Sequence, residues 1–145
     1  MLNVIVTGGL GAGKTNLINR LAGTGIYVIG SPATTMKRSL AKVIARTYNE
    51  GNSSQGTDSG WQLFFDCMMD RHEKEKYRGI LQGYGEHFSN ADNFFWIHRT
   101  VAEVKAEIGD IQYLGEGHRV DGTIWDSIRR PSEIIGIKEV FPDAI

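Results

Sequence analysis

Apolar residues recur along this chain in patterns that alternate between short strands and amphipathic helices. The first run, residues 2–6, has the length and β-branched content of a buried strand. Leu17, Ile18 and Leu21 then recur at helical spacing, and a second short apolar run occupies residues 26–29. A strand, a helix and another strand in this order predict an α/β protein.

The middle of the chain is dominated by helical spacing. We expect helices over residues 33–48, from residue 61 onward and over residues 92–108, with the polar, glycine-rich residues 50–60 as a loop or hinge. Glycines within residues 77–86 weaken the pattern for one continuous helix there. The candidate core residues of the first and third helices are Met36, Leu40, Val43, Ile44, Thr47, Phe95, Trp96, Val101, Val104 and Ile108.

The strand pattern returns near the C-terminus. Residues 110–121 fit either a strand or a hairpin, and the pattern does not decide between them. Residues 122–126 form a short apolar run that ends in an acid. Pro131 suits the first turn of a helix over residues 132–141, and residues 142–145 have the pattern of an approach to another strand.

The segment between the first strand and the first helix carries the clearest chemical signal. Residues 8–15, Gly-Gly-Leu-Gly-Ala-Gly-Lys-Thr, fit the phosphate-binding pattern G-x-x-x-x-G-K-[ST]. Backbone N–H groups of such a loop surround phosphate oxygens, and the following helix adds the positive end of its dipole. The flanking strand and helix favour a nucleoside triphosphate site over a glycine-rich turn. The residues expected to bind ATP are Gly8, Gly11, Ala12, Gly13, Lys14 and Thr15.

Two side chains near this loop have more specific expected roles. Lys14 should reach the β- and γ-phosphates, and the Thr15 hydroxyl should ligate Mg²⁺. Asp126, at the end of the apolar run 122–126, has the form of the second nucleotide motif, whose carboxylate holds Mg²⁺ directly or through water. Alone this second pattern is weak, and the phosphate loop makes it a functional hypothesis.

Lys37 and Arg38 lie in the first turns after the second predicted strand. In open α/β sheets, ligands bind beyond the carboxyl ends of the strands. The two cations therefore either face a substrate or belong to a solvated helix face, and the sequence leaves both possibilities open.

Composition narrows the class of protein. The chain has 145 residues, 41% of them hydrophobic, and a formal net charge of −1, which predicts a single soluble domain over residues 1–145. This charge gives no electrostatic case for nucleic acid or an anionic membrane as the main partner. Cys67 is the only cysteine, so we expect no disulfide and a cytoplasmic setting. No run reaches transmembrane length, we expect no signal peptide, and the four histidines are too scattered for a zinc site.

Three blocks follow the phosphate loop in a recognisable order. They are Leu81-Gln82-Gly83-Tyr84-Gly85, then Asp92 with Phe95-Trp96-Ile97-His98-Arg99, and then Asp126 with Ile128-Arg129-Arg130-Pro131-Ser132-Glu133. Together they resemble the bacteriophage-type deoxynucleoside monophosphate kinases. More broadly they resemble the P-loop nucleotide kinases, which include adenylate kinase and dephospho-CoA kinase. The resemblance spans about residues 2–142, and each block is short.

The resemblance implies a P-loop three-layer α/β/α fold with a mostly parallel sheet, in which residues from about 33 to 108 form a helical monophosphate-binding insertion. It implies ATP-dependent phosphorylation of a (deoxy)nucleoside monophosphate, with ATP and Mg²⁺ as cofactors. Lys14, Asp126 and Arg129 match catalytic positions. The residues expected on the acceptor side are Lys37, Arg38, Gln82, Arg99 and Arg130.

The chain also departs from these kinases. Their chains continue into another strand, an arginine-bearing lid and a final helix and strand, whereas this sequence stops at Ile145. We therefore expect a C-terminally truncated fold with an exposed sheet edge, completed by a partner segment or a second copy, or else marginally stable. Ser127 stands where dephospho-CoA-kinase-like relatives often carry glycine.

Other functions remain open from the sequence. A dephospho-CoA kinase or another small-molecule kinase is the nearest alternative, and a nucleotide-binding module without catalysis is a second. A GTPase-type switch is disfavoured, because the sequence has no Asn-Lys-x-Asp base-reading motif.

Overall fold

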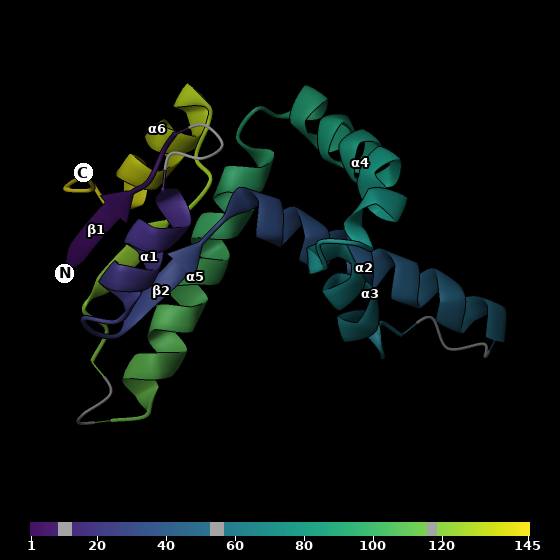
Figure 1. Ribbon diagram of the computed structural model, residues 1–145, viewed down its shortest axis with the longest axis horizontal. Helices are drawn as coiled ribbons and strands as arrows, with labels where there is room; N and C mark the ends of the chain where they lie inside the picture. The colour runs from purple at the N-terminus through teal and green to yellow at the C-terminus, as the bar shows by residue number, and fades with distance from the viewer. Residues whose placement is uncertain (9–12, 53–56, 116–118) are drawn as a thin grey trace. The chain divides into compact units, whose positions relative to one another are not determined.

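The structure, a computed structural model, describes residues 1–8, 13–52, 57–115 and 119–145 (Figure 1). Its contacts divide the chain into two compact units. Unit 1 comprises Met1–Pro32 and Asn93–Ile145, and unit 2 is the continuous stretch Ala33–Asp92. Each unit has its own apolar core.

Unit 1 is built on a small parallel sheet. Its strands are β1 (Leu2–Ile5), β2 (Tyr27–Gly30) and β3 (Gly122–Trp125), so the three predicted strands are confirmed to within one residue at each end. Although β3 comes last in the chain, it lies between the other two, in the order β1-β3-β2. Both pairings are parallel, and the protein is therefore a mixed α/β protein.

Helices cover both faces of this sheet (Figure 1). On one face Ile18 of α1 (Lys14–Ala22) packs with Ile124 of β3. On the other face α5 (Phe95–Tyr113) and α6 (Pro131–Val140) pack against Trp125 of β3. Successive residues of a strand point to opposite faces, so Ile124 and Trp125 anchor one helical layer each.

The sheet is held together by a buried polar chain and one close contact. Trp125 Nε1–H donates to Thr123 Oγ1 at 2.8 Å, and the Thr123 hydroxyl donates to Asn3 Oδ1 at 2.7 Å. These bonds join β1 to β3 and favour a single register between them. A Cβ at Gly30 would lie 2.6 Å from ring carbons of Trp125, so the indole occupies the space that only a glycine leaves free.

The last residue also joins the sheet. Ile145 N–H donates to the Asn3 carbonyl at 3.0 Å, and Ile5 N–H donates to the Ile145 carbonyl at 2.7 Å. On β1 the amides of Leu2 and Val6 bond toward β3, and alternate residues of a strand bond to opposite neighbours. Ile145 therefore lies on the outer edge of β1, in agreement with the predicted approach to another strand.

Unit 2 is helical. It contains α2 (Pro32–Asn52), α3 (Trp61–Met69), the short 3₁₀ helix η1 (Lys74–Tyr77) and α4 (Arg78–Ala91). The first residue of α2, Pro32, is assigned to unit 1. Leu40, Met68 and Leu81 form the centre of its core. The Ser39 and Tyr84 hydroxyls, 2.8 Å apart, link α2 to α4.

The structure corrects several expectations about the helices. Helix α4 runs without interruption through the glycines of residues 79–85, and a Cβ at Gly85 would meet the Met36 sulfur of α2 at close range. Helix α5 continues to Tyr113, so neither a strand nor a hairpin occurs in residues 110–115 or 119–121. The helical insertion was expected to cover about residues 33–108. Unit 2 instead ends at Asp92, because α5 packs with the sheet of unit 1.

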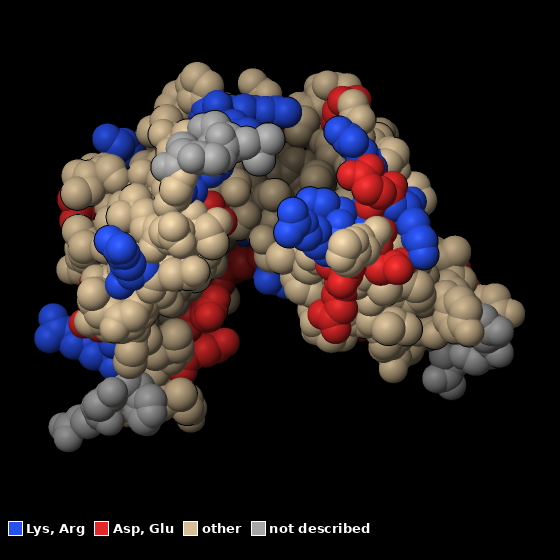
Figure 2. Space-filling model, viewed as in Figure 1, with Lys and Arg blue, Asp and Glu red and all other residues tan. Residues whose placement is uncertain are grey.

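The surface in view carries both signs of charge. Lys and Arg side chains are interspersed with Asp and Glu over this face (Figure 2). Among the residues that the structure describes, no helix is long and apolar enough to cross a bilayer.

Candidate functional site

The candidate site lies at the carboxyl ends of two neighbouring strands. Ile5 of β1 is paired with Trp125 of β3, and Val6 N–H donates to the Trp125 carbonyl at 2.8 Å. Because the strands are parallel and adjacent, the segments that follow them emerge at the same edge of the sheet. The start of the phosphate loop and Asp126 are therefore neighbours, although 118 positions separate Gly8 from Asp126 in the sequence.

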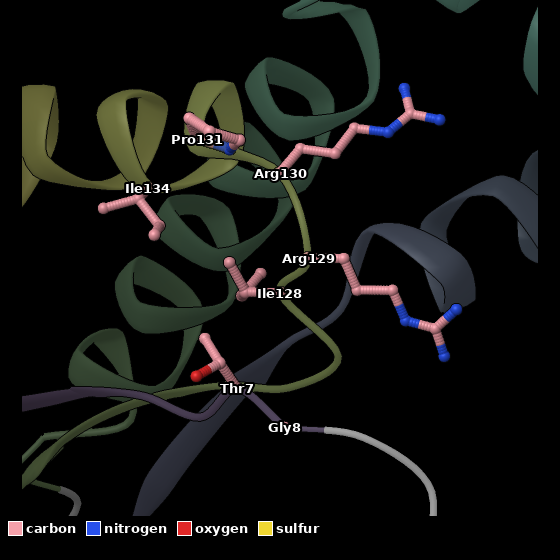
Figure 3. Close-up of a pocket in the computed structure, with 7 residues that line it drawn as sticks. All are labelled: Thr7, Gly8, Ile128, Arg129, Arg130, Pro131 and Ile134. Carbon is pink, nitrogen blue, oxygen red and sulfur yellow. The ribbon is translucent and has the colours of Figure 1, made fainter.

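A pocket of about 350 Å³ opens at this edge (Figure 3). Its volume falls within the usual range for small-molecule sites, about 300–1,000 Å³. The residues that line it are Thr7, Gly8, Ile128, Arg129, Arg130, Pro131 and Ile134. Arg129 and Arg130 are solvent-exposed cations, so the pocket joins the start of the phosphate loop to two guanidinium groups suited to an anion.

Helix α1 begins in a manner suited to a phosphate. Gly13 is its N-cap and has a left-handed backbone with φ 81°, which a residue with a Cβ adopts only at a cost. No side chain among the described residues caps this helix, and its first turn has no acidic residue. Half-buried Lys14 and exposed Thr15 open the helix, and its first N–H groups point toward any anion bound there. Of the predicted loop residues, Gly11 and Ala12 lie outside the described residues.

Asp126 leaves β3 in a constrained position. Its backbone N–H donates to the Gly30 carbonyl at 2.8 Å, and the Ser127 hydroxyl donates to its Oδ1 at 3.2 Å. Ser127 itself has φ 60°, which lies in the left-handed region that favours glycine.

This conformation predicts how Ser127 tolerates substitution. Ser127→Gly relieves the left-handed strain but adds unfolded-state entropy, so the free energy of unfolding should stay within about 1 kcal/mol of the original. Ser127→Val should lower it by about 2 kcal/mol or more, because a β-branched residue fits this region poorly. Urea titrations measure both, with Asn90→Val, at an exposed helical position, as the control. Equal midpoints for the original chain and the Ser127→Val variant would contradict the strain.

The oxygen donors at the site suit Mg²⁺. A magnesium ion bridged to phosphates needs only one or two protein ligands of this hard type, and the Thr15 hydroxyl and Asp126 carboxylate are such groups. Within the described ranges, no three His, Cys, Asp or Glu side chains cluster as a metal site. The residues present therefore fit a metal held jointly with a nucleotide rather than a cage made by the protein alone.

The acceptor-side residues are distributed over both units. Arg130 lines the pocket and Arg99 lies exposed on α5, with its guanidinium 5.8 Å from the Phe95 ring centroid. Lys37, Arg38 and Gln82 belong to unit 2, so the geometry of unit 1 does not join them to the pocket.

Within unit 2 the three residues have different surroundings. Lys37 is half-buried, and desolvation, followed by the nearby Lys74 ammonium, lowers the pKa of its side chain. The Arg38 guanidinium lies 5.7 Å from the Phe65 ring centroid. Gln82 is exposed and donates to Glu86 Oε1 at 3.2 Å. Lys37 therefore carries a charge that burial has already partly desolvated.

The sequence motifs did not single out Thr7 or Ile134, and they included Ile128 and Glu133 only as members of the block 128–133, without a role of their own. Thr7 and Ile128 adjoin predicted motif residues, so proximity in sequence could have suggested them. Glu133 follows Arg130 by three positions, the spacing at which an acid can bond back to the start of a helix.

Comparison with protein-family models, with curated proteins and with solved structures gave no match to this chain. The functional argument therefore rests on the residues and geometry described above.

Proposed function

We propose that this protein is an ATP-dependent phosphotransferase with a P-loop three-layer α/β/α fold that converts a (deoxy)nucleoside monophosphate to the diphosphate. The observation that carries the proposal is the shared edge of β1 and β3. There Gly8 and the pair Arg129–Arg130 line one pocket, and Asp126 follows the strand next to β1. We assign the reaction to the cytoplasm, where the lone Cys67 would stay reduced.

Phosphoryl transfer depends mainly on positioning and on cations around the phosphate oxygens. The loop amides and the first turn of α1 would bind the phosphates, with Lys14 at the β- and γ-phosphates. Arg129 would stabilise the charge on the transferred group, because its planar donor fork matches phosphate oxygens. Thr15 and Asp126 would hold Mg²⁺, which neutralises phosphate charge when bound.

The acceptor monophosphate would be recognised by the remaining cations and amide. Arg99 and Arg130 are the candidates within unit 1, and Lys37, Arg38 and Gln82 are separate candidates within unit 2. The partial desolvation of Lys37 supports this role, since an ammonium that has already lost water gives up less solvation on binding an anion.

A coupled assay of ADP release tests the function. The purified chain, ATP and Mg²⁺ are combined with each of the four common deoxynucleoside monophosphates in turn, and with dephospho-CoA in a separate reaction. Release that depends on one or more monophosphates supports the proposal, and release with dephospho-CoA alone identifies the other kinase. ATP binding without turnover on any acceptor would show a nucleotide-binding module instead.

Asp126→Asn separates metal binding from ATP binding. The amide is a weaker magnesium ligand and carries no charge, so kcat should fall about a hundredfold or more while ATP affinity without metal is retained. Steady-state kinetics over a series of Mg²⁺ concentrations, with calorimetry for ATP, measure both effects. Asp110→Asn, an exposed change on α5, is the control, and an equal loss in both variants would contradict a metal role.

A further inference from the structure

Glu133 lies in the first turn of α6, between two residues that line the pocket, Pro131 and Ile134. Arg130 is the N-cap of this helix, Pro131 begins it, and Glu133 is its third residue. Glu133 N–H donates to the Arg130 carbonyl at 3.1 Å, and the backbone N–H groups of Arg129 and Arg130 bond in turn to the Glu133 carboxylate. The acid therefore holds the backbone of both pocket arginines, as the acid of a capping box holds an N-cap.

Burial makes the position of the Glu133 carboxylate energetically unfavourable. Its Oε2 atom is buried and has no hydrogen-bond partner among the described residues, and desolvation raises the pKa of the Glu133 carboxyl despite the nearby Arg130 and Arg129. An acid beside an anion-binding pocket also opposes the anion electrostatically. Helix capping alone does not require these costs, because Ser, Thr or Asn at an N-cap would satisfy the same helix end.

The orientation of the Arg129 and Arg130 side chains explains why an acid occupies position 133. They leave consecutive positions of the loop, and in Figure 3 both side chains extend to the same side of it. Arg130 has an extended backbone, with φ −112° and ψ 144°, and side chains of successive extended residues normally diverge. Keeping both arginine side chains on the same side of the loop therefore requires a fixed backbone at residues 129 and 130.

We propose that Glu133 is a positioning residue whose carboxylate, bonded to the Arg129 and Arg130 amides, holds the Arg129 guanidinium toward the transferred phosphate and the Arg130 guanidinium toward the acceptor monophosphate. The inference rests on the proposed function, because it presupposes that the pocket binds a nucleoside triphosphate. Glu133 acts through the arginines and does not itself contact the nucleotide.

A positioning role and a purely electrostatic role predict opposite changes in ATP affinity when Glu133 is replaced. If Glu133 were only a nearby negative charge, removing it would tighten ATP binding. If it positions the arginines, Glu133→Ala should weaken ATP binding about tenfold, the loss of roughly one charge-assisted hydrogen bond. Glu133→Gln keeps an acceptor oxygen and should restore part of the affinity.

Isothermal titration of ATP into the full chain measures these affinities. Thermal melts by circular dichroism are run in parallel to identify any variant that fails to fold, and Glu133→Gln is the variant least exposed to that failure. Glu139→Gln is the matched control, since Glu139 is an exposed acid on the same helix and pairs with His98 at 3.4 Å. It should leave ATP affinity within about twofold, as expected for an exposed, screened charge.

A mutant cycle tests whether Glu133 affects ATP affinity through Arg129 and Arg130. In a background with both Arg129→Ala and Arg130→Ala, Glu133→Ala should change ATP affinity less than about twofold, because its targets are gone. Tighter binding in Glu133→Ala, or an undiminished loss in the arginine-free background, would overturn the proposal. If the unmodified chain binds ATP but all Glu133 variants match it, the positioning role alone fails. If the unmodified chain binds no ATP, the proposed function fails and the positioning role with it.

Discussion

Replacing Lys14 with alanine is expected to abolish ATP binding at ordinary assay concentrations, and turnover with it. Truncating one partner of a desolvated charge pair costs about 2–5 kcal/mol, so affinity should fall about thirtyfold or more. Lys14 is the first residue of α1, where it would lie beside the phosphates together with the first N–H groups of the helix. Calorimetric titration with ATP, with and without Mg²⁺, measures the loss.

The fold should survive this change. Lysine and alanine are both good helix formers, and Lys14 is only half-buried, so circular dichroism and thermal melts should match those of the unmodified chain. Lys105→Ala, which removes an exposed cation from α5, is the matched control and should leave ATP affinity within about twofold. Equal affinities in the two variants would exclude the phosphate loop as the ATP site.

Replacing Trp125 with alanine is expected to produce the largest loss of stability. Trp125 is fully buried, packs against Phe141 with ring centroids 5.8 Å apart, and fills the space beside Gly30. Aromatic-to-alanine changes in a core cost about 3–5 kcal/mol, a large part of the roughly 5–15 kcal/mol by which domains are typically stable. Urea unfolding followed by far-ultraviolet circular dichroism measures the change.

Two further variants separate the parts of this effect. Trp125→Phe keeps much of the ring but loses the Nε1–H bond to Thr123, and should cost about 1–2 kcal/mol. Tyr113→Ala, at a side chain that is 91% exposed, should change stability by less than about 0.5 kcal/mol. A Trp125→Ala protein as stable as the Tyr113→Ala control would show that the sheet core does not limit stability.

The sequence was sufficient to predict the strands because each is a short apolar run with clear boundaries. It was also sufficient for α1 and α6, where Gly13 and Pro131 mark the starts of the helices. The position of β3 between β1 and β2 could not be predicted from these local patterns. Strand order follows from which helices cover which face, and local spacing does not contain it.

The continuity of α4 and the extra length of α5, which the sequence pattern did not predict, have a common physical cause. Glycine disfavours a helix by about 1 kcal/mol per residue, but the contacts of Leu81 and Tyr84 with the core of unit 2 support α4 through its glycines. Ile111 likewise packs against the core of unit 1 and extends α5 past Ile108. In both cases tertiary packing outweighs the local propensity from which the prediction was made.

Motifs in the sequence selected several of the residues that lie together at this edge of the sheet. Thus Gly8, Arg129 and Arg130 line one pocket, and Asp126 follows the adjacent strand. The sequence could not show that Glu133 has a buried carboxylate oxygen, because an acid in a first helical turn looks like ordinary capping until its burial is known. Nor could it show that Ser127 has a left-handed backbone.

The position of β3 also affects how a newly made chain acquires its structure. Leu2 of β1 can pair with Gly122 of β3 only after residue 122 has been synthesised. Unit 2, in contrast, is one continuous stretch, Ala33–Asp92. Contacts close in sequence form faster than distant ones, and the N-terminal part of a chain leaves the ribosome first. The helical unit can therefore fold while β1 is still unpaired, and the pocket at the shared edge of β1 and β3 is among the last parts to form during synthesis.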